Sequence, residues 1–488
     1  MKKVIFTIAT VSCLLFLNAK QAKAQYTKLL DFNGTTNGGN TKGSLMQATN
    51  GMLYGMTYNG GASTNCSYGC GVLFQYNPTT NVYTKKLDFA GTTNGQSPYG
   101  SLMQASDGML YGMTSTGGAS TVCTNGCGVL FQYNPATDTY TKKLDFNGTS
   151  NGSSPMGSLM QATDGMLYGM TKYGGASTDG ILFQYNPITN VYTDKFDFTY
   201  TNGTTPLGSL MQASDGMLYG MTSAGGAGGG YGVLFQYNTA TNTYTKKLDF
   251  AGTTNGRYPY GSLMQATDGM LYGMTNAGGV GGSGVLFQYN TVTNTLTDKF
   301  DFTYASGSSP YSSSLIQATD GMLYGMLYEA GANGYGVLFQ YNPATSTYTK
   351  KLDFAGTTNG INPYGDLMQA TNGMLYGMTG QGGASTYCAT GCGVLFKYGI
   401  GATGINQVAN SNEQVSIYPN PNNGSFVIEP NNNTKQTVQM FDINGKLVLS
   451  QTINGKTTID ASILSEGVYN ICITSNEGII NKKLVIVK

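Results

Sequence analysis

Residues 101–114, Ser-Leu-Met-Gln-Ala-Ser-Asp-Gly-Met-Leu-Tyr-Gly-Met-Thr, recur along the chain in seven similar copies. The copies carry their leucine at Leu45, Leu102, Leu159, Leu210, Leu263, Leu315 and Leu367. Each copy is followed by a run like Gly-Val-Leu-Phe-Gln-Tyr, and each except the last by one like Lys-Leu-Asp-Phe. The run missing after the last copy stands at the other end of the chain, at residues 26–32. A period of about 50 residues is typical of propellers and repeat arrays.

Each repeat contains four short runs with strand character, and none has helical periodicity. In the second copy they cover residues 102–105, 109–114, 129–133 and 140–146. Asp-Gly or Asn-Gly separates the first two runs, which predicts a hairpin turn with positive φ at both central residues. Asn-Pro-Ala-Thr or a relative separates the last two, again a turn sequence. Four antiparallel strands in each of seven repeats predict an all-β fold, a seven-bladed β-propeller.

The permuted repeat also predicts how the ring closes. Residues 26–32 would supply the outer strand of the last blade, so that both ends of the repeat region lie in one sheet. The alternative is an open β-solenoid, which has no need of a permuted strand.

Composition excludes several classes of function. Charged residues make up 10% of the 488 residues, so no basic surface for nucleic acid is expected. The chain has no His, which removes Ser-His-Asp and Cys-His catalysis and the commonest metal ligand. We expect no cofactor and no bound metal. The repeated methionines and the repeated Asp of the fourth strand are interpreted as parts of the scaffold, the Asp as a hydrogen-bond acceptor for a neighbouring turn.

Residues 1–24 have the pattern of a secretory signal peptide. Lys2-Lys3 precedes an apolar run at residues 4–17, and Ala22-Lys23-Ala24 resembles a cleavage site. The apolar run is too short to span a bilayer, and no other segment is apolar enough to do so.

The repeats resemble two known families. The double glycine after residues 109–114 and the sequence Tyr133-Asn134-Pro135-Ala136-Thr137 resemble the kelch repeat, although the kelch Trp is missing. Leu-Tyr-Gly-x-Thr, Gly-Gly and Gly-Val-Leu-Phe resemble more closely the bacterial tandem repeat called GloVer, which implies a surface repeat protein without a defined activity. The predicted propeller covers residues 25–398.

The composition changes after Tyr398. Residues 399–413 are expected to form a linker, and residues 414–488 a small β-sandwich. The latter resemble the C-terminal sorting domain of the bacterial type IX secretion system, which implies export through that machinery to the outer-membrane surface or the medium. The residues that carry the motif are Tyr418, Pro419, Asn420, Pro421, Gly424, Gly445, Gly467 and Tyr469.

Six cysteines form three Cys-x3-Cys pairs. The pairs are Cys66 and Cys70, Cys123 and Cys127, and Cys388 and Cys392. All lie between the second and third strands of blades 1, 2 and 7, which a closed ring makes neighbours. Disulfides suit an exported protein; a four-thiolate zinc site and free thiols are the alternatives. This sector is a candidate contact surface.

A ligand site is expected where the loops before the first strands meet the central channel. The residues predicted at that mouth are Lys42, Tyr99, Met156, Leu207, Tyr260, Tyr311 and Tyr364. Such a broken ring of tyrosines suits a sugar or a protein partner, and the alternative is that the rings only cap the blades.

Three further candidates break the repeat. Arg257 is the only Arg, Glu329 is the only Glu of the repeats, and Asp366 replaces a Ser.

Taken together, these features lead us to expect an exported binding or adhesion module for a glycan or protein. A polysaccharide-degrading enzyme that uses Asp366 and Glu329 is the alternative, and a purely structural surface protein is a third possibility.

Overall fold

The computed structural model describes residues 26–400, 415–430, 435–442, 447–475 and 478–488. These residues form two compact units, divided after Ile400. The signal-peptide prediction, nearly all of the expected linker and Gly445 lie outside the described residues.

The first unit consists of four-stranded antiparallel sheets in tandem, seven in number within residues 26–400. The first strands are β2 (Met46–Gln47), β6 (Met103–Gln104), β10 (Met160–Gln161), β14 (Met211–Gln212), β18 (Met264–Gln265), β22 (Ile316–Gln317) and β26 (Met368–Gln369). The second strands are β3 (Leu53–Thr57), β7 (Leu110–Thr114), β11 (Leu167–Thr171), β15 (Leu218–Thr222), β19 (Leu271–Thr275), β23 (Leu323–Leu327) and β27 (Leu375–Met378).

The outer half of each sheet is longer. The third strands are β4 (Val72–Asn77), β8 (Val129–Asn134), β12 (Ile181–Asn186), β16 (Val233–Asn238), β20 (Val285–Asn290), β24 (Val337–Asn342) and β28 (Val394–Tyr398). The fourth strands are β5 (Val82–Asp88), β9 (Thr139–Asp145), β13 (Val191–Asp197), β17 (Thr243–Asp249), β21 (Thr295–Asp301), β25 (Thr347–Asp353) and, for the last sheet, β1 (Tyr26–Asp31). A single 3-10 turn, η1 (Tyr200–Asn202), interrupts the loop after β13.

Two local expectations were wrong. The first strands have two residues each and not four, because the segment before the strand bonds the neighbouring blade, as Ser44 N–H does to Ser101 Oγ, and the hairpin loop begins directly after the strand at Ala48. The following turn has positive φ at one residue only: Gly108 has a φ of 81°, whereas Asp107 does not adopt positive φ. Ala105 N–H donates to the carbonyl of Met109, and Gly108 N–H to that of Ala105. This is a three-residue hairpin loop, in which a single left-handed position suffices.

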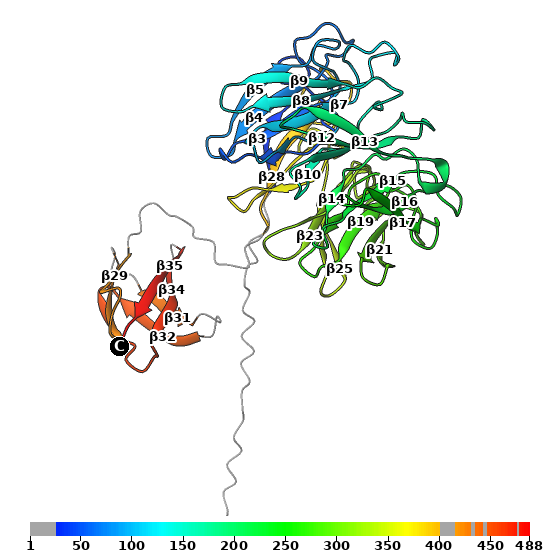
Figure 1. Cartoon of the computed structure of the whole chain (residues 1–488). Helices are drawn as coiled ribbons and strands as arrows, with labels where there is room; N and C mark the ends of the chain where they lie inside the picture. The colour runs from blue at the N-terminus through cyan, green and yellow to red at the C-terminus, as the bar shows by residue number, and fades with distance from the viewer. Residues whose placement is uncertain (1–25, 401–414, 431–434, 443–446, 476–477) are drawn as a thin grey trace, which may run out of the picture. The chain divides into compact units, whose positions relative to one another are not determined.

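The permuted strand closes the last sheet, as the sequence predicts. β1 pairs antiparallel with β28, with Tyr26 opposite Tyr398 and Asp31 opposite Val394. One apolar cluster contains Leu395 of β28 together with Leu53 of β3, so the last sheet packs against the first. Figure 1 shows β28, in yellow, beside the blue β3.

Backbone contacts round the channel complete the ring. A Cβ at Gly43 would lie 2.4 Å from the carbonyl oxygen of Gly100, so only glycine permits this approach of neighbouring sheets. Beside it, Ser44 N–H donates to Ser101 Oγ at 2.7 Å. The same contact continues through Ser158, Ser209, Ser262, Ser314 and Asp366, and returns to Ser44. The sheets therefore form a closed β-propeller.

The core lies between the sheets. Tyr54 and Met56 of β3 belong to one buried cluster with Leu110 of β7 and Phe131 of β8. Equivalent clusters join each of the other neighbouring pairs of sheets. The repeated tyrosines and methionines thus fill the space between blades, which confirms their structural interpretation.

The repeated Asp of the fourth strand holds a neighbouring loop. Asp88 Oδ1 accepts the N–H of Ala62 at 2.9 Å, and five of the other six copies make the same kind of bond. Asp197 departs from this pattern, because its buried Oδ1 has no hydrogen-bond partner within the described residues. In the other six copies, the prediction that this Asp accepts a hydrogen bond from a neighbouring loop is confirmed.

The second unit is a small β-sandwich. One sheet contains β29 (Val415–Tyr418), β30 (Ser425–Pro430) and β33 (Thr457–Asp460). The other contains β31 (Lys435–Phe441), β32 (Leu447–Asn454), β34 (Gly467–Ser475) and β35 (Gly478–Ile486). Phe426 and Ile459 of the first sheet share one buried cluster with Ile471 and Leu484 of the second.

The predicted sorting residues hold the ends of this sandwich. Asn420 bonds the backbone of β35 twice, to Lys483 O and from Val485 N–H, each at 2.8 Å. Tyr418 donates its hydroxyl to Glu429, and Tyr469 donates to Ser465 O at 2.8 Å. Pro419 and Pro421 lie between these contacts in the loop after β29, and Gly424 and Gly467 take positive φ.

Candidate functional site

The central channel opens on the face that carries the loops before the first strands and after the second strands. A cavity of about 310 Å³ occupies this mouth. Its lining residues are Asn40, Lys42, Tyr58, Tyr99, Met156, Lys172, Leu207, Tyr311, Ser312 and Tyr364. Six of the seven residues predicted at the mouth are among them, and the seventh, Tyr260, lines the narrower neck below. The volume is at the lower end of small-molecule sites.

Tyrosine rings contact one another along one side of the mouth. The ring centroids of Tyr260 and Tyr311 lie 4.9 Å apart, and those of Tyr311 and Tyr364 lie 5.4 Å apart. Tyr328 adds a contact of 4.6 Å to Tyr364. Tyr99 instead contacts Tyr58, with centroids 6.1 Å apart. Most of these ring pairs meet edge to face, so each tyrosine ring restricts the orientation of its neighbour. All of these tyrosines are half-buried.

Two lysines line the same cavity. Lys42 Nζ lies 3.2 Å from the centroid of the Tyr364 ring and 5.9 Å from that of Tyr58. Lys172 Nζ lies 4.8 Å from the centroid of the Tyr173 ring. Burial lowers the pKa of Lys42 to about 7, because the charged form loses contact with water. Burial raises the pKa of Tyr99 to about 12 and raises that of Tyr364 as well, so both phenols are neutral at physiological pH.

The neck beneath the mouth is narrow, about 30 Å³. Hydroxyls from the serine ring line it, and Asp366 stands in that ring where the other blades have serine. Ser314 N–H donates to Asp366 Oδ1, and Asp366 N–H donates to Ser44 Oγ at 2.6 Å. Burial raises the pKa of Asp366 to about 6, although the hydrogen bonds from Ser314 and Ser44 oppose this change.

Arg257 and Glu329 lie elsewhere. The guanidinium carbon of Arg257 lies 5.6 Å from the ring centroid of Tyr258 and 5.7 Å from that of Tyr231. Glu329 is exposed and accepts a long hydrogen bond of 3.5 Å from Ser309. Glu329 lines a groove between blades, whereas Asp366 lines the neck of the channel. The structure therefore does not bring the three residues that break the repeat into one site.

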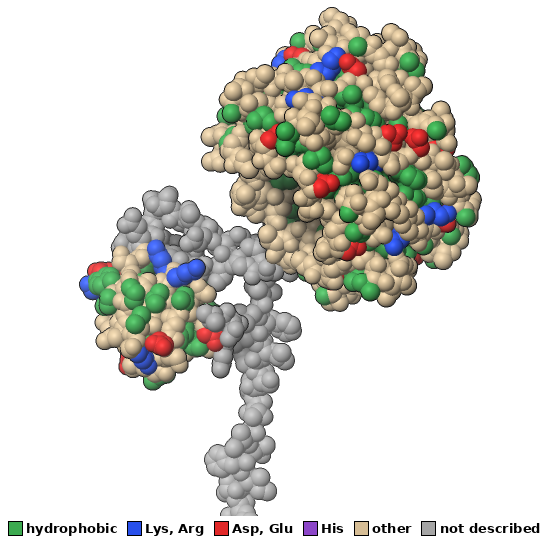
Figure 2. Space-filling view, in the orientation of Figure 1, with side chains coloured by type: hydrophobic (Ala, Val, Ile, Leu, Met, Phe, Trp, Pro, Cys, Tyr) green, Lys and Arg blue, Asp and Glu red, His purple; other side chains and the backbone are tan. Residues whose placement is uncertain are grey.

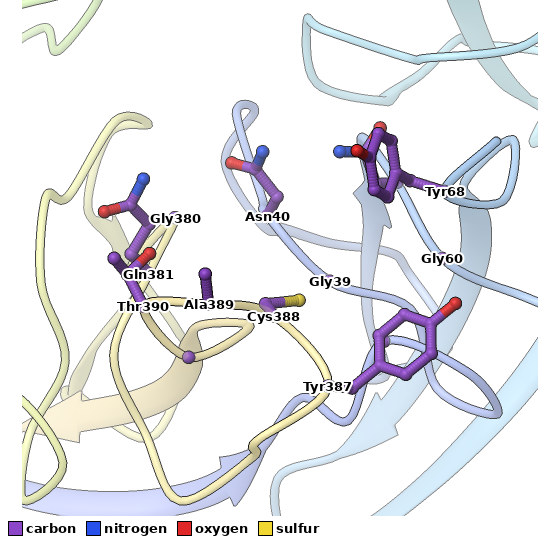
Figure 3. A pocket seen from close by; sticks show the side chains of 13 residues that line it. Gly39, Asn40, Gly60, Tyr68, Gly380, Gln381, Tyr387, Cys388, Ala389 and Thr390 are labelled. Atoms are coloured by element: carbon purple, nitrogen blue, oxygen red, sulfur yellow. The ribbon is translucent and has the colours of Figure 1, made fainter.

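Two further hollows lie between neighbouring blades. A wide groove of about 1040 Å³ lies between the sixth and seventh blades and includes Tyr304, Tyr328, Glu329 and Tyr335. A pocket of about 240 Å³ lies between the seventh and first blades. Figure 3 shows Gln381 and Thr390 on one side of this pocket, Tyr68 and Tyr387 on the other, and Asn40 between them.

The three cysteine pairs are disulfides, as expected for an exported protein. Their Cα–Cα distances are 5.3 Å for the first pair and 5.2 Å for the other two. The loop of the Cys388–Cys392 disulfide borders both hollows. No group of three or more potential metal ligands occurs among the described residues. The disulfide of the last blade thus fixes the wall that the groove and the pocket share.

Four residues that line the mouth were not predicted from the sequence: Asn40, Tyr58, Lys172 and Ser312. Tyr58 and Lys172 directly follow second strands, and the N–H of each donates to a carbonyl in the loop before the first strand, as Lys172 N–H does to Ser154 O at 3.3 Å. The sequence did contain a signal for Tyr58 and Lys172, because the residue directly after the second strand differs between the copies. It reads Tyr58, Ser115, Lys172, Ser223, Asn276, Tyr328 and Gly380.

Comparison with known proteins identifies the repeats. The family profile of the Gloeobacter/Verrucomicrobia repeat matches residues 15–124, 120–266 and 249–447. The chain belongs to this repeat family. The C-terminal unit of this Gloeobacter/Verrucomicrobia repeat protein matches the secretion system C-terminal sorting domain over residues 416–487. The protein is therefore exported, to the cell surface or the medium.

Solved structures give more distant similarities to this repeat protein. TolB from Acinetobacter baumannii is 10% identical, with a TM-score of 0.36 over 71% of this chain and 79% of that chain. The GH74 xyloglucanase from Xanthomonas campestris is 12% identical, with a TM-score of 0.44 over 83% of this chain and 59% of that chain. A protein of unknown function from Dyadobacter fermentans is 10% identical, with a TM-score of 0.42 over 77% of this chain and 98% of that chain. No curated protein matches the chain.

Charge is sparse on the repeat protein. Figure 2 shows few blue and red side chains, single or in small groups, among uncharged ones on the face of the propeller that it presents. Among the described residues, no helix is long and apolar enough to cross a membrane.

Proposed function

We propose that the propeller is a surface-displayed carbohydrate-binding module and that the mouth of its channel is the binding site. The observation that carries this proposal is the cluster of half-buried tyrosines, in which Tyr260, Tyr311 and Tyr364 hold each other edge to face. A ring so fixed loses little side-chain entropy when a ligand binds. Tyrosine offers an apolar face to a sugar ring and a hydroxyl to its polar rim.

The shape of the mouth supports a binding role for a chain end or a single sugar unit. The cavity is open on the loop face and narrows to the serine-lined neck, so a ligand enters from one side only. The serine ring is engaged in hydrogen bonds from backbone N–H groups and acts as a rigid floor. The inter-blade groove at Glu329 supplies adjoining surface, since Tyr328 contacts both regions.

The geometry gives less support to a polysaccharide-degrading enzyme. Glycoside hydrolysis uses two carboxyl groups that flank the bond, about 5 to 10 Å apart. Asp366 lies in the neck, and Glu329 lines the groove between blades. A protein ligand remains a further prediction for the exposed tyrosines of the disulfide loops, Tyr68 and Tyr387.

The test is a glycan array probed with the mature chain, followed by calorimetry on each hit. Tyr364→Ala and Tyr260→Ala are expected to weaken binding at least about tenfold, because each removes a buried aromatic contact. Tyr200→Ala is the matched control, since that tyrosine is 60% exposed and lines no part of the mouth. Binding without the release of reducing ends or unsaturated products supports the proposal. Turnover of a bound glycan would contradict it.

A further inference from the structure

Lysine is the only charged residue type that lines the mouth. Among the residues round the 310 Å³ cavity, Lys42 and Lys172 are basic and no Asp or Glu is present. The rest are tyrosines, small polar residues and the apolar Met156 and Leu207. A chain with so few charged residues places two cations in one small cavity.

Neither cation forms an ion pair with a described residue. The ion pairs of the described residues involve other lysines, mostly those of the outer strands. Lys42 rests on Tyr364, and Lys172 rests on Tyr173. An aromatic face attracts an ammonium group but accepts no N–H···O hydrogen bond, so donors of both amines stay available.

Asp366 does not serve as the missing counter-ion. Its carboxyl lies in the neck, where Oδ1 accepts the N–H of Ser314. Lys42 also borders the neck, yet it forms no ion pair with Asp366. A half-buried amine without a counter-ion is costly, and a bound anion that accepts its hydrogen bonds would remove that cost.

We infer that the mouth selects sugars that carry an anionic group, a carboxylate or a sulfate, with Lys42 and Lys172 as its counter-ions. This inference rests on the carbohydrate-binding function proposed above. The tyrosines would contact the sugar ring, and the two amines would bind the anion at its edge. Charge-assisted hydrogen bonds are about twice as strong as neutral ones, so the charged group would dominate the choice between similar sugars.

The experiment compares matched ligands on the full mature chain. Calorimetry measures binding of uronate oligosaccharides and their carboxyl-reduced forms, and of sulfated oligosaccharides and their desulfated forms. The variants are Lys42→Met and Lys172→Met, which keep an unbranched side chain and remove the charge. Lys143→Met is the control, because Lys143 lies on the outer strand β9 and bonds Asn190. Thermal melts establish that each variant is folded.

The expected result is that one anionic ligand binds at least about tenfold more tightly than its neutral form. Each mouth variant should reduce that preference about tenfold, and the control should change neither the preference nor the affinity for the neutral ligand. The carboxylate and sulfate arms show which anion is preferred. Equal binding of the anionic and neutral forms overturns this inference and leaves the carbohydrate site intact. If no sugar binds, both the inferred preference for anionic sugars and the proposed carbohydrate-binding function are overturned.

Discussion

Asp366 in the serine ring allows a quantitative test of the neck. The pKa of its carboxyl is raised from 3.8 to about 6 by burial. A tenfold change in an acid dissociation constant corresponds to about 1.4 kcal/mol, so ionised Asp366 lowers the free energy of unfolding by up to about 3 kcal/mol at pH 7. Replacing it with Asn or Ser should recover that amount, since Asn keeps an acceptor for Ser314 N–H and Ser restores the residue of the other blades.

The sign of the pH dependence follows from the raised pKa. Between pH 4 and pH 6 the folded protein binds a proton that the unfolded chain does not, so the cost disappears as the pH falls. Asp366→Asn and Asp366→Ser should therefore stabilise the propeller at pH 7 and differ little from the natural protein at pH 4. Ser209→Ala is the control, because it removes the equivalent acceptor for Ser158 N–H and should destabilise equally at both values.

The assay is urea unfolding of the mature chain at pH 4, 5, 6 and 7. Because the chain has no Trp, the unfolding is followed by tyrosine fluorescence and circular dichroism. A change in stability that does not vary with pH, or a loss of stability in Asp366→Asn at pH 7, would show that ionised Asp366 does not destabilise the neck. The second result would mean that the carboxylate stabilises the neck.

Three further predictions concern the scaffold. Phe32→Ala should lower the free energy of unfolding by about 3 to 5 kcal/mol, as much as Phe250→Ala in an ordinary blade, because both rings are fully buried. A much smaller loss of stability at Phe32 would show that β1 contributes little to closing the ring. Asp194, whose pKa is raised to about 6 by burial and by the charge of Asp197, occupies the place where Lys142 pairs with Asp145. Asp194→Lys should stabilise the protein at pH 8 by up to about 1 kcal/mol in urea unfolding, and Lys142→Asp should do the reverse. Changing Cys388 and Cys392 together to Ser should lower the stability of the propeller by about 2 kcal/mol or less. Faster hydrogen exchange confined to the loop of that disulfide is expected, and exchange throughout the blade would contradict this.

The repetition in the sequence accounts for most of what was predictable. A residue present in every copy occupies the same place in every blade, so Tyr54, Met56 and Asp88 could be recognised as scaffold. The cut repeat predicted the pairing of β1 with β28. The prediction for the turn after the first strand was wrong, because Asp-Gly fits more than one hairpin loop and only the backbone decides which forms.

The site was less predictable because it depends on where side chains lie in three dimensions. The residues before the first strand were found, since they have a fixed offset from the motif. Tyr58 and Lys172 follow second strands and line the mouth of the channel, but the sequence does not show that these side chains lie there. Glu329 and Asp366 are both departures from the repeat, yet they line different hollows, because Glu329 follows a second strand and Asp366 precedes a first strand.

Sugar binding at the aromatic mouth of the channel is the main function proposed for this protein. It is tested most directly by a crystal structure of the mature chain with the tightest glycan from the array. The expected result is a sugar ring in the mouth, in contact with Tyr364 and Tyr311, with an anionic group within hydrogen-bond distance of Lys42. A glycan bound on the outer strands, or in the groove beside Glu329 with the mouth empty, would contradict it.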